Sequence, residues 1–158
     1  METSKQEKVI IALHDQFSGS RIQDFIARHG WYNRTEFHVA HVIEPATPAR
    51  PADPAWNEAR ERAHKSASSL LGDFSDTIRT VAPDLEVRQH ILEGRAAEEL
   101  VKLAQDETAS LIIMGCRGRK GLKRWLLGSV SHDVAHRAPC SVVILKINYT
   151  STSNGRRN

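Results

Sequence analysis

The sequence is short of cysteine, with Cys116 and Cys140 as its only two. A secreted protein held together by disulfides needs more. In the parallel sheet predicted below, Cys116 follows the fourth strand and Cys140 precedes the fifth, so they lie at opposite edges, roughly 15 Å apart at ~3.3 Å per residue. A disulfide tolerates Cα atoms only within ~7 Å. We therefore expect two free thiols, which are typical of a reducing compartment.

Long hydrophobic runs are also lacking. Apolar runs such as Val142–Leu145 are far too short to cross a bilayer, because a transmembrane helix needs about 20 apolar residues. The segment Met1–Lys8 is polar and has no apolar core of the kind found in signal peptides. These absences predict a cytoplasmic protein with no membrane partner.

Neither sign of charge dominates, since 22 Lys and Arg against 19 Asp and Glu give a net charge of +3. Such a small excess is no argument for a nucleic-acid partner. Basic residues do gather in Arg117–Arg124, which is either a solvated loop or a segment that attracts a triphosphate. Only Trp125 could supply the aromatic stacking that single-stranded nucleic acid needs, so we expect no nucleic acid.

The chain has the hydrophobic and charged content of a globular protein, 40% and 26%, and its 158 residues fit one domain. We place this domain at residues 8–147 and expect flexible tails at 1–7 and 148–158. Short apolar runs predict five strands, at Val9–Leu13, Phe37–Ile43, Leu85–Leu92, Leu111–Met114 and Ser141–Lys146.

Apolar residues at helical spacing fill the intervals between these strands. They predict four helices. The first starts at Ser18 or Ser20 as N-cap and ends at Gly30, and the second covers Trp56–Thr80 with a break or bend near Gly72. The third covers Ala97–Ala104 and the last covers Ser129–Arg137. Alternating strands and helices indicate a parallel sheet with helices on both faces, a three-layer α/β/α sandwich. Ligands of such sheets bind beyond the carboxyl ends of the strands, where the strand order reverses.

One motif lies at that edge, between the fourth strand and the last helix. Gly115 and Gly118 are followed after nine residues by Gly128 and Ser129. We interpret Gly115 as a sharp turn off the strand and Gly118 as a close backbone approach to a ligand. Gly128 and Ser129 would open a helix whose free N–H groups, positive dipole end and Ser129 and Ser131 hydroxyls attract phosphate. Neither a Walker loop nor a Rossmann glycine fingerprint occurs.

The spacing G-x2-G-x9-G-[ST] resembles the nucleotide-binding signature of the universal stress protein family. The stretches around Ile112–Gly118, Leu126–Val130 and Pro139–Ile144 are similar to that family as well. The resemblance implies a Rossmann-like sheet of the adenine nucleotide alpha hydrolase type, with strand order 3-2-1-4-5. It also implies a homodimer formed through the last strand, with Val143 near its centre.

The resemblance further implies ATP as the cofactor, with Mg²⁺ tolerated or preferred. Adenine would lie near Asp15 and Val42. The ribose and phosphates would lie on the motif and the residues that flank it, which are Met114, Gly115, Arg117, Gly118, Gly128, Ser129, Val130 and Ser131. Asp15 could instead cap the first helix.

No catalytic set can be placed, because the sequence suggests no Ser-His-Asp, paired-carboxylate or Cys–His arrangement. His132 and His136 lie at i, i+4 but lack a third metal ligand, so we predict no metal site. His14 and His41 end neighbouring strands and are expected to be structural or to line the site. The leading hypothesis is an ATP-binding stress-response regulator whose nucleotide state modulates association with itself or with a protein partner that the sequence does not identify. The alternatives are a slow ATPase, or another nucleotide-handling enzyme, and an interaction module that has lost its nucleotide.

Overall fold

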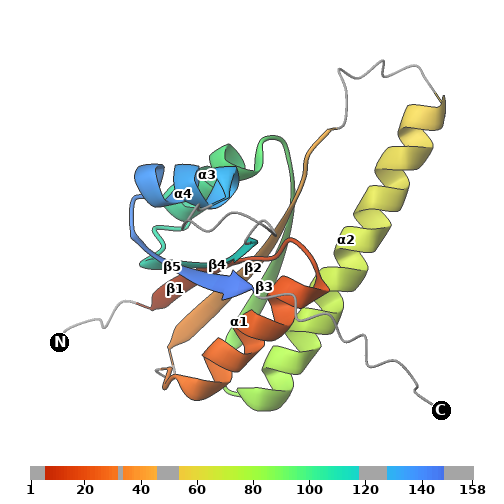
Figure 1. Cartoon of the computed structure of the whole chain (residues 1–158). Coiled ribbons are helices and arrows are strands. Elements are labelled where there is room, and N and C mark those ends of the chain that lie inside the picture. Colours follow the sequence, from red (N-terminus) through yellow and green to blue (C-terminus); the bar gives the residue numbers. More distant parts are fainter. Residues whose placement is uncertain (1–5, 32–33, 46–53, 118–127, 148–158) are drawn as a thin grey trace, which may run out of the picture.

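The computed structural model describes residues 6–31, 34–45, 54–117 and 128–147. Strands and helices alternate along these residues (Figure 1). Their bounds are β1 (Glu7–Ala12), α1 (Gln16–Arg28), β2 (Thr35–Ile43), α2 (Pro54–Val81), β3 (Glu86–Glu93), α3 (Ala96–Asp106), β4 (Leu111–Arg117), α4 (Ser129–Arg137) and β5 (Ser141–Ile147).

The strands form one parallel sheet in the order β3-β2-β1-β4-β5, which confirms the predicted topology. The central strand β1 pairs on both sides, so that Ile11 lies opposite Val39 of β2 and Ile113 of β4. The order of strands reverses between β1 and β4. The carboxyl ends of these two strands therefore mark the place where ligands of open α/β sheets bind.

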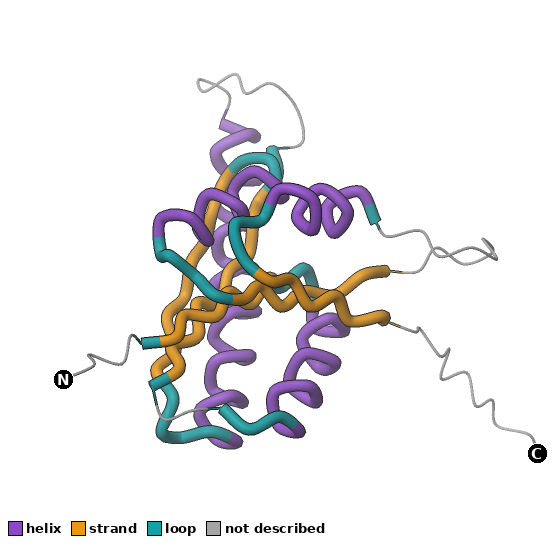
Figure 2. Tube along the Cα trace, turned by 90° about the vertical axis from the view of Figure 1, so that its left-hand side faces the viewer, coloured by secondary structure: helices purple, strands orange, loops and turns teal. Residues whose placement is uncertain are grey.

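Helices cover both faces of the sheet, with α1 and α2 on one side and α3 and α4 on the other (Figures 1 and 2). Successive side chains of a strand point to opposite faces. On β1, Val9 and Ile11 accordingly join the core under α1 and α2, whereas Ile10 and Ala12 join the core under α3 and α4. This two-sided burial explains why β1 is a continuous apolar run rather than an alternating one.

Helix α1 begins earlier than predicted: Ser18 and Ser20 were wrong as N-cap candidates, and the alternative that Asp15 caps the helix is confirmed. Asp15 is the N-cap: its Oδ1 accepts the Ser18 N–H at 2.8 Å, and the Ser18 hydroxyl oxygen accepts the Asp15 N–H at 3.1 Å. Ser18 thus occupies the third helical position of a capping box instead of the cap itself. The reciprocal pair satisfies two backbone donors, which a cap at Ser18 or Ser20 would leave unpaired.

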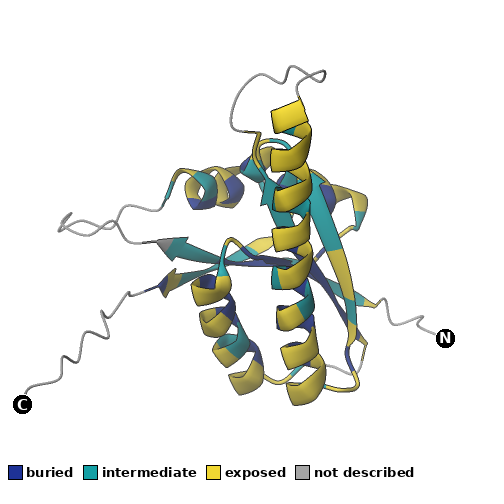
Figure 3. Ribbon diagram, turned by 90° about the vertical axis from the view of Figure 1, so that its right-hand side faces the viewer, coloured by how far each residue is buried: buried dark blue, intermediate teal, exposed yellow. Residues whose placement is uncertain are grey.

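Helix α2 runs unbroken from Pro54 to Val81, so the break expected near Gly72 does not occur. Glycine inside a helix costs about 1 kcal/mol relative to alanine. The burial of neighbouring Leu71, Phe74 and Ile78 in the core outweighs that cost. The first half of α2 rises beyond the sheet and is largely exposed (Figure 3). No helix of the described residues is both long and apolar enough to cross a membrane.

Two ionisable side chains of β2 are fully buried on the α3 side of the sheet. Glu36 and His38 are each 1% exposed. Glu36 pairs with Arg88 of β3, and Nδ1 of His38 lies 2.9 Å from Nε2 of His90. The remaining nitrogen of His38 lies 3.3 Å from the Glu36 carboxylate without forming a hydrogen bond. This polar group lies near the amino ends of the strands, at the opposite end from the strand reversal described above.

Candidate functional site

A small cavity opens at the carboxyl ends of β1 and β4. It has a volume of about 210 Å³ and is bounded by the ends of β1, β2, β4 and β5 and by the starts of α1, α3 and α4. Its lining consists of Ala12, Leu13, His14, Ser18, Ala40, Val42, Ala96, Leu100, Met114, Gly115, Cys116, Gly128, Ser129, Val130, Ser131 and Ile147. This position at the strand reversal is the one predicted for the ligand.

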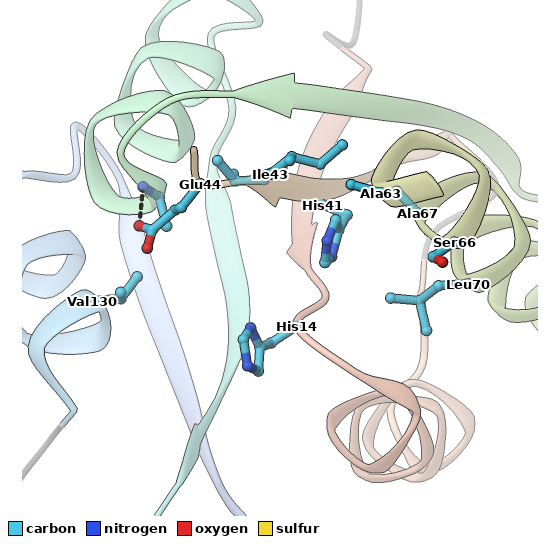
Figure 4. Close-up of a pocket in the computed structure, with 11 residues that line it drawn as sticks. His14, His41, Ile43, Glu44, Ala63, Ser66, Ala67, Leu70 and Val130 are labelled. Carbon is cyan, nitrogen blue, oxygen red and sulfur yellow. Dashed lines mark hydrogen bonds between the residues drawn. The ribbon is translucent and has the colours of Figure 1, made fainter. Parts of the chain in front are cut away.

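A larger cavity of about 440 Å³ adjoins the first, on the side of α2 (Figure 4). Four residues line both cavities, so a single ligand could extend from one into the other; they are His14, Val42, Ala96 and Val130. The remaining walls come from the end of β2 and the first half of α2, and they are Ile43, Glu44, His41, Ala63, Ser66, Ala67 and Leu70. Ligand sites usually measure about 300–1,000 Å³, and of these two cavities only the larger reaches that range.

The structure brings most of the predicted site residues together around the smaller cavity. They are Val42, Met114, Gly115, Gly128, Ser129, Val130 and Ser131. Gly118 lies outside the described residues, and so does the side chain of Arg117, whose backbone ends β4. Asp15 lines neither cavity, and its carboxylate caps α1. Contact between Asp15 and a ligand therefore stays a prediction.

The interpretation of Gly115 as a turn was wrong, because it lies inside β4 opposite Leu145. A Cβ atom built at Gly115 would lie 2.5 Å from Cδ1 of Ile147 and 3.1 Å from Cβ of Ser18. Real Cβ contacts do not become as short as the first of these distances. The glycine is thus required by packing, since it lets α1 and β5 close over the end of β4 and form the floor of the cavity.

The amino end of α4 forms one wall of the smaller cavity. Gly128 is its N-cap, and no side chain caps the helix by a hydrogen bond. Ser129 and Val130, in the first turn, have N–H groups without an intrahelical acceptor, because the first N–H groups of any helix lack one. The Ser131 hydroxyl donates to the Gly128 carbonyl at 3.0 Å and so keeps its lone pairs for a further donor. Together with the helix dipole, this wall favours an anion.

Cys116 also lines the smaller cavity, although sequence reasoning placed it in a loop after the strand. Its sulfur accepts the Gly128 N–H at 3.3 Å, which joins the end of β4 to the start of α4. Residues two apart on a strand share a face. Once β4 extends to Arg117, Cys116 must share the face of Met114, and this alternation was the signal that could have found it. Neither cysteine forms a disulfide, as predicted.

Two polar contacts organise the larger cavity. Nδ1 of His41 lies 3.0 Å from the Leu13 carbonyl oxygen and donates to it. Oε1 of Glu44 accepts the Ala96 N–H at 2.8 Å and so caps α3, whose own N-cap residue Arg95 makes no capping hydrogen bond with its side chain. Glu44 and the α2 residues were not predicted as site residues. Their proximity depends on where a helix distant in sequence crosses the end of β2.

A charged cluster, which we call the clasp, ties the first half of α2 to the end of β3. Arg60 donates to the two Glu93 carboxylate oxygens at 2.9 and 2.6 Å, and Nε2 of His64 lies 2.6 Å from the same carboxylate. These hydrogen bonds, that of Arg60 first, lower the pKa of Glu93 to about 2. His64 follows Ala63, a wall residue of the larger cavity. The clasp therefore fixes the helix that forms that wall.

Metal chemistry finds no support in the described part of the chain, where no group of three or more His, Cys, Asp or Glu could hold an ion. His132 and His136 pack edge to face with ring centroids 5.6 Å apart, and the His132 ring lies near Asp133. Both imidazoles are exposed on α4. Their i, i+4 spacing is therefore a feature of the helix surface.

A parallel sheet in this order, with an uncapped helix at the strand reversal, defines a Rossmann-like α/β protein. The model of the universal stress protein family matches residues 24–146, and the chain belongs to that family. Universal stress protein YxiE of Bacillus subtilis is 43% identical over 90 residues, which cover 57% of this chain and 60% of that protein. The chain spans about half the length of the curated relatives it matches, 42% of one and 60% of another.

Solved structures of the family share the fold. That of MJ0577, a universal stress protein of Methanocaldococcus jannaschii, superposes with a TM-score of 0.74 at 26% identity and covers 92% of this chain and 99% of that one. A family member from Arabidopsis thaliana, solved with AMP bound, gives a TM-score of 0.65 at 16% identity and covers 94% of this chain and 96% of that one. At that identity the second likeness shows the fold alone.

Proposed function

We propose that this protein binds an adenine nucleotide, with ATP as the physiological ligand, in the two adjoining cavities. The observation that carries the proposal is the α4 amino terminus, which has no side-chain cap and faces the smaller cavity. An anion-binding wall beside a cavity of about 440 Å³ matches a ligand with phosphate at one end and a bulky group at the other. AMP bound to the Arabidopsis relative supports the same class of ligand.

The phosphates would lie against α4. The N–H groups of Ser129 and Val130 and the Ser129 hydroxyl would donate to them, and Gly128 leaves the approach open. The Ser131 hydroxyl would have to leave the Gly128 carbonyl before it could donate as well. The rest of the nucleotide would then extend past Val42, which lines both cavities, into the larger cavity. No carboxylate of the described residues lines the smaller cavity, so Mg²⁺ would be held chiefly by phosphate oxygens and water.

The bound nucleotide would regulate association in the cytoplasm, as part of a stress response. Strand β5 pairs only with β4, which leaves its outer edge unpaired among the described residues. Its central side chains are half-buried in the single chain. Edge strands of this kind pair with a second strand unless they are protected. A homodimer through β5 would satisfy the open edge, since a twofold interface needs only one self-complementary patch.

The direct test is calorimetric titration of the purified protein with ATP, ADP and AMP, with and without Mg²⁺. Thermal melting provides the second readout, because a ligand at a hundred times its dissociation constant stabilises the fold by about 2.7 kcal/mol. Mass spectrometry of any small molecule released on denaturation identifies a copurified ligand. If all three nucleotides leave both heat and melting curve unchanged, the proposal is wrong. Single-turnover assays with labelled ATP separate a regulator from a slow ATPase.

A further inference from the structure

The wall of the larger cavity that α2 and the end of β2 form is mostly apolar. Ile43, Ala63, Ala67 and Leu70 supply hydrocarbon surface from β2 and α2 (Figure 4). An aromatic ring system suits such walls, because its faces need no hydrogen-bond partners. A ribose suits this part of the wall poorly, because its hydroxyls would lose water without gaining a partner on the hydrocarbon side chains. The larger cavity is therefore the better place for the base of a nucleotide, with the sugar nearer the shared wall.

His41 projects from the end of β2 toward this space, where His14 and Leu70 also lie (Figure 4). Its Nδ1 bonds the Leu13 carbonyl oxygen at 3.0 Å. A carbonyl oxygen can only accept, so Nδ1 carries a hydrogen. In the neutral imidazole, Nε2 is then a bare acceptor. Among the described residues Nε2 has no hydrogen-bond partner.

Glu44, whose side chain also lines this cavity, is an acceptor as well. Glu44 directs one carboxylate oxygen to the Ala96 N–H. Of the polar side chains on the α2 wall, only Ser66 could donate, through its hydroxyl. The described side chains at the end of β2 thus offer acceptors at His41 and Glu44, which would pair with a hydrogen-bond donor on the ligand.

We propose that His41 determines base specificity by accepting a hydrogen bond from the exocyclic amine of a 6-aminopurine held in the larger cavity. The inference rests on the proposed function and adds the residue that reads the base. A 6-oxopurine presents an oxygen at the same position. That oxygen would oppose the Nε2 lone pair, leaving two acceptors desolvated and unpaired, which a site built for a hydrogen bond rejects strongly.

The test compares AMP, IMP and the monophosphate of unsubstituted purine riboside by calorimetry at pH 8, above the range in which imidazoles ordinarily protonate. These three ligands share ribose and phosphate. Purine riboside monophosphate differs from AMP only at position 6, whereas IMP also carries a hydrogen on N1. We expect AMP to bind at least about tenfold more tightly than either, which corresponds to ~1.4 kcal/mol. Equal affinities for all three overturn the role of His41, although nucleotide binding stands. Failure of all three to bind overturns the proposed function instead.

The variant His41→Asn sharpens the test, because the asparagine amide can still donate to the Leu13 carbonyl but has no counterpart of Nε2. We expect this variant to lose most of the preference for AMP over IMP while it still binds both. His29→Asn is the matched control, since His29 stacks on Phe25 at the exposed end of α1 and lines neither cavity. Both variants are compared only after melting curves show a folded chain. A folded His41→Asn protein with the full preference would show that another group reads the amine.

Discussion

His38 of β2 and His90 of β3 share one hydrogen bond, with 2.9 Å between Nδ1 of the first and Nε2 of the second. Their rings are nearly parallel, 13° apart, with centroids separated by 5.0 Å. One ring must donate and the other accept, so both cannot be protonated while the bond lasts. The pair is therefore built for neutral histidines.

The charges around this pair are already balanced without a proton on either ring. Arg88 faces the buried Glu36, and Lys8 bonds Glu107 at 2.6 Å. Burial lowers the pKa of His38, an effect that the nearby Glu107 and Glu36 carboxylates oppose. Burial also lowers the pKa of His90.

We predict that this pair makes the fold sensitive to acid. A histidine whose pKa is lower in the folded chain binds more protons when the chain unfolds, so stability rises with pH. The contribution is fully present above the unfolded pKa, near 6.5, and is lost as the pH falls toward the folded pKa. Urea unfolding at a series of pH values should show a falling free energy of unfolding below about pH 6.5. His90→Gln should flatten this slope relative to His29→Gln, and a slope that both variants share would contradict the assignment.

The clasp yields a prediction on local motion. Glu93→Gln removes the charge that holds Arg60 and His64, so hydrogen exchange in residues 54–66 should become faster. Exchange around Leu71 should not change, because that part of α2 is held by the core. Nucleotide affinity should fall, since the wall at Ala63 loosens. Glu58→Gln is the control, because Glu58 pairs with Arg62 on the exposed surface of the same helix. Equal hydrogen-exchange rates in both variants would show that the clasp does not restrain the first half of α2.

The α4 wall can be tested at its cap. A Cβ at Gly128 would lie 3.6 Å from Oγ of Ser131, an ordinary contact, and the residue has a negative φ of −59°. Gly128→Val should therefore fold, yet its methyl groups occupy space beside the proposed phosphates. We expect at least a tenfold loss of nucleotide affinity, or ~1.4 kcal/mol. Gly30→Val is the matched control, since nothing lies within 4 Å of a Cβ there. Unchanged affinity in folded Gly128→Val would place the phosphates elsewhere.

Packing at Gly115 gives a prediction on stability. Gly115→Ala should destabilise the fold by about 1–3 kcal/mol, the usual cost of an extra atom in a filled space. Most of the strain should come from Cδ1 of Ile147, 2.5 Å from the new Cβ. Ile147→Val removes that atom, so the double variant should lose less stability than the two single changes together. Additive losses in chemical unfolding would show that Ile147 is not the obstacle.

Strand β5 carries the prediction on assembly. Sedimentation at micromolar concentration should give a dimer rather than a mass near 17.7 kDa. Val143→Lys should raise the dissociation constant, because it places a charge at the centre of the proposed contact. The lysine also loses a packing contact with the core, so a melting curve must accompany the measurement. A wild-type monomer, or a dimer indifferent to charge at Val142 and Ile144 as well, would move the contact to another face.

The fold was largely predictable, because apolar runs and alternating elements depend on local pattern. The sequence also placed Ser129 and Ser131 at a helix start beside the strand reversal, as found. It could not decide between Asp15 and Ser18 as the cap, since both residues suit that role and only the capping box separates them.

The larger cavity was beyond sequence reasoning for a different reason. Ala63, Ser66 and Leu70 have nothing chemical to mark them, and they become a wall only because α2 crosses the end of β2. Gly115 was misread because a glycine at a strand end signals a turn by local rules. The clash that excludes a side chain there comes from Ile147, 32 positions later.

Ile147 belongs to two places at once: it ends β5, the proposed dimer strand, and it forms part of the floor of the smaller cavity. A ligand that presses on this floor and a second subunit that pairs with this strand would act on one side chain. Thermodynamic linkage then makes the effect mutual: any factor by which nucleotide changes the dimerisation constant is the factor by which dimerisation changes nucleotide affinity. Regulation of assembly would then need no hinge and no moving domain, only a change in the position of the Ile147 side chain.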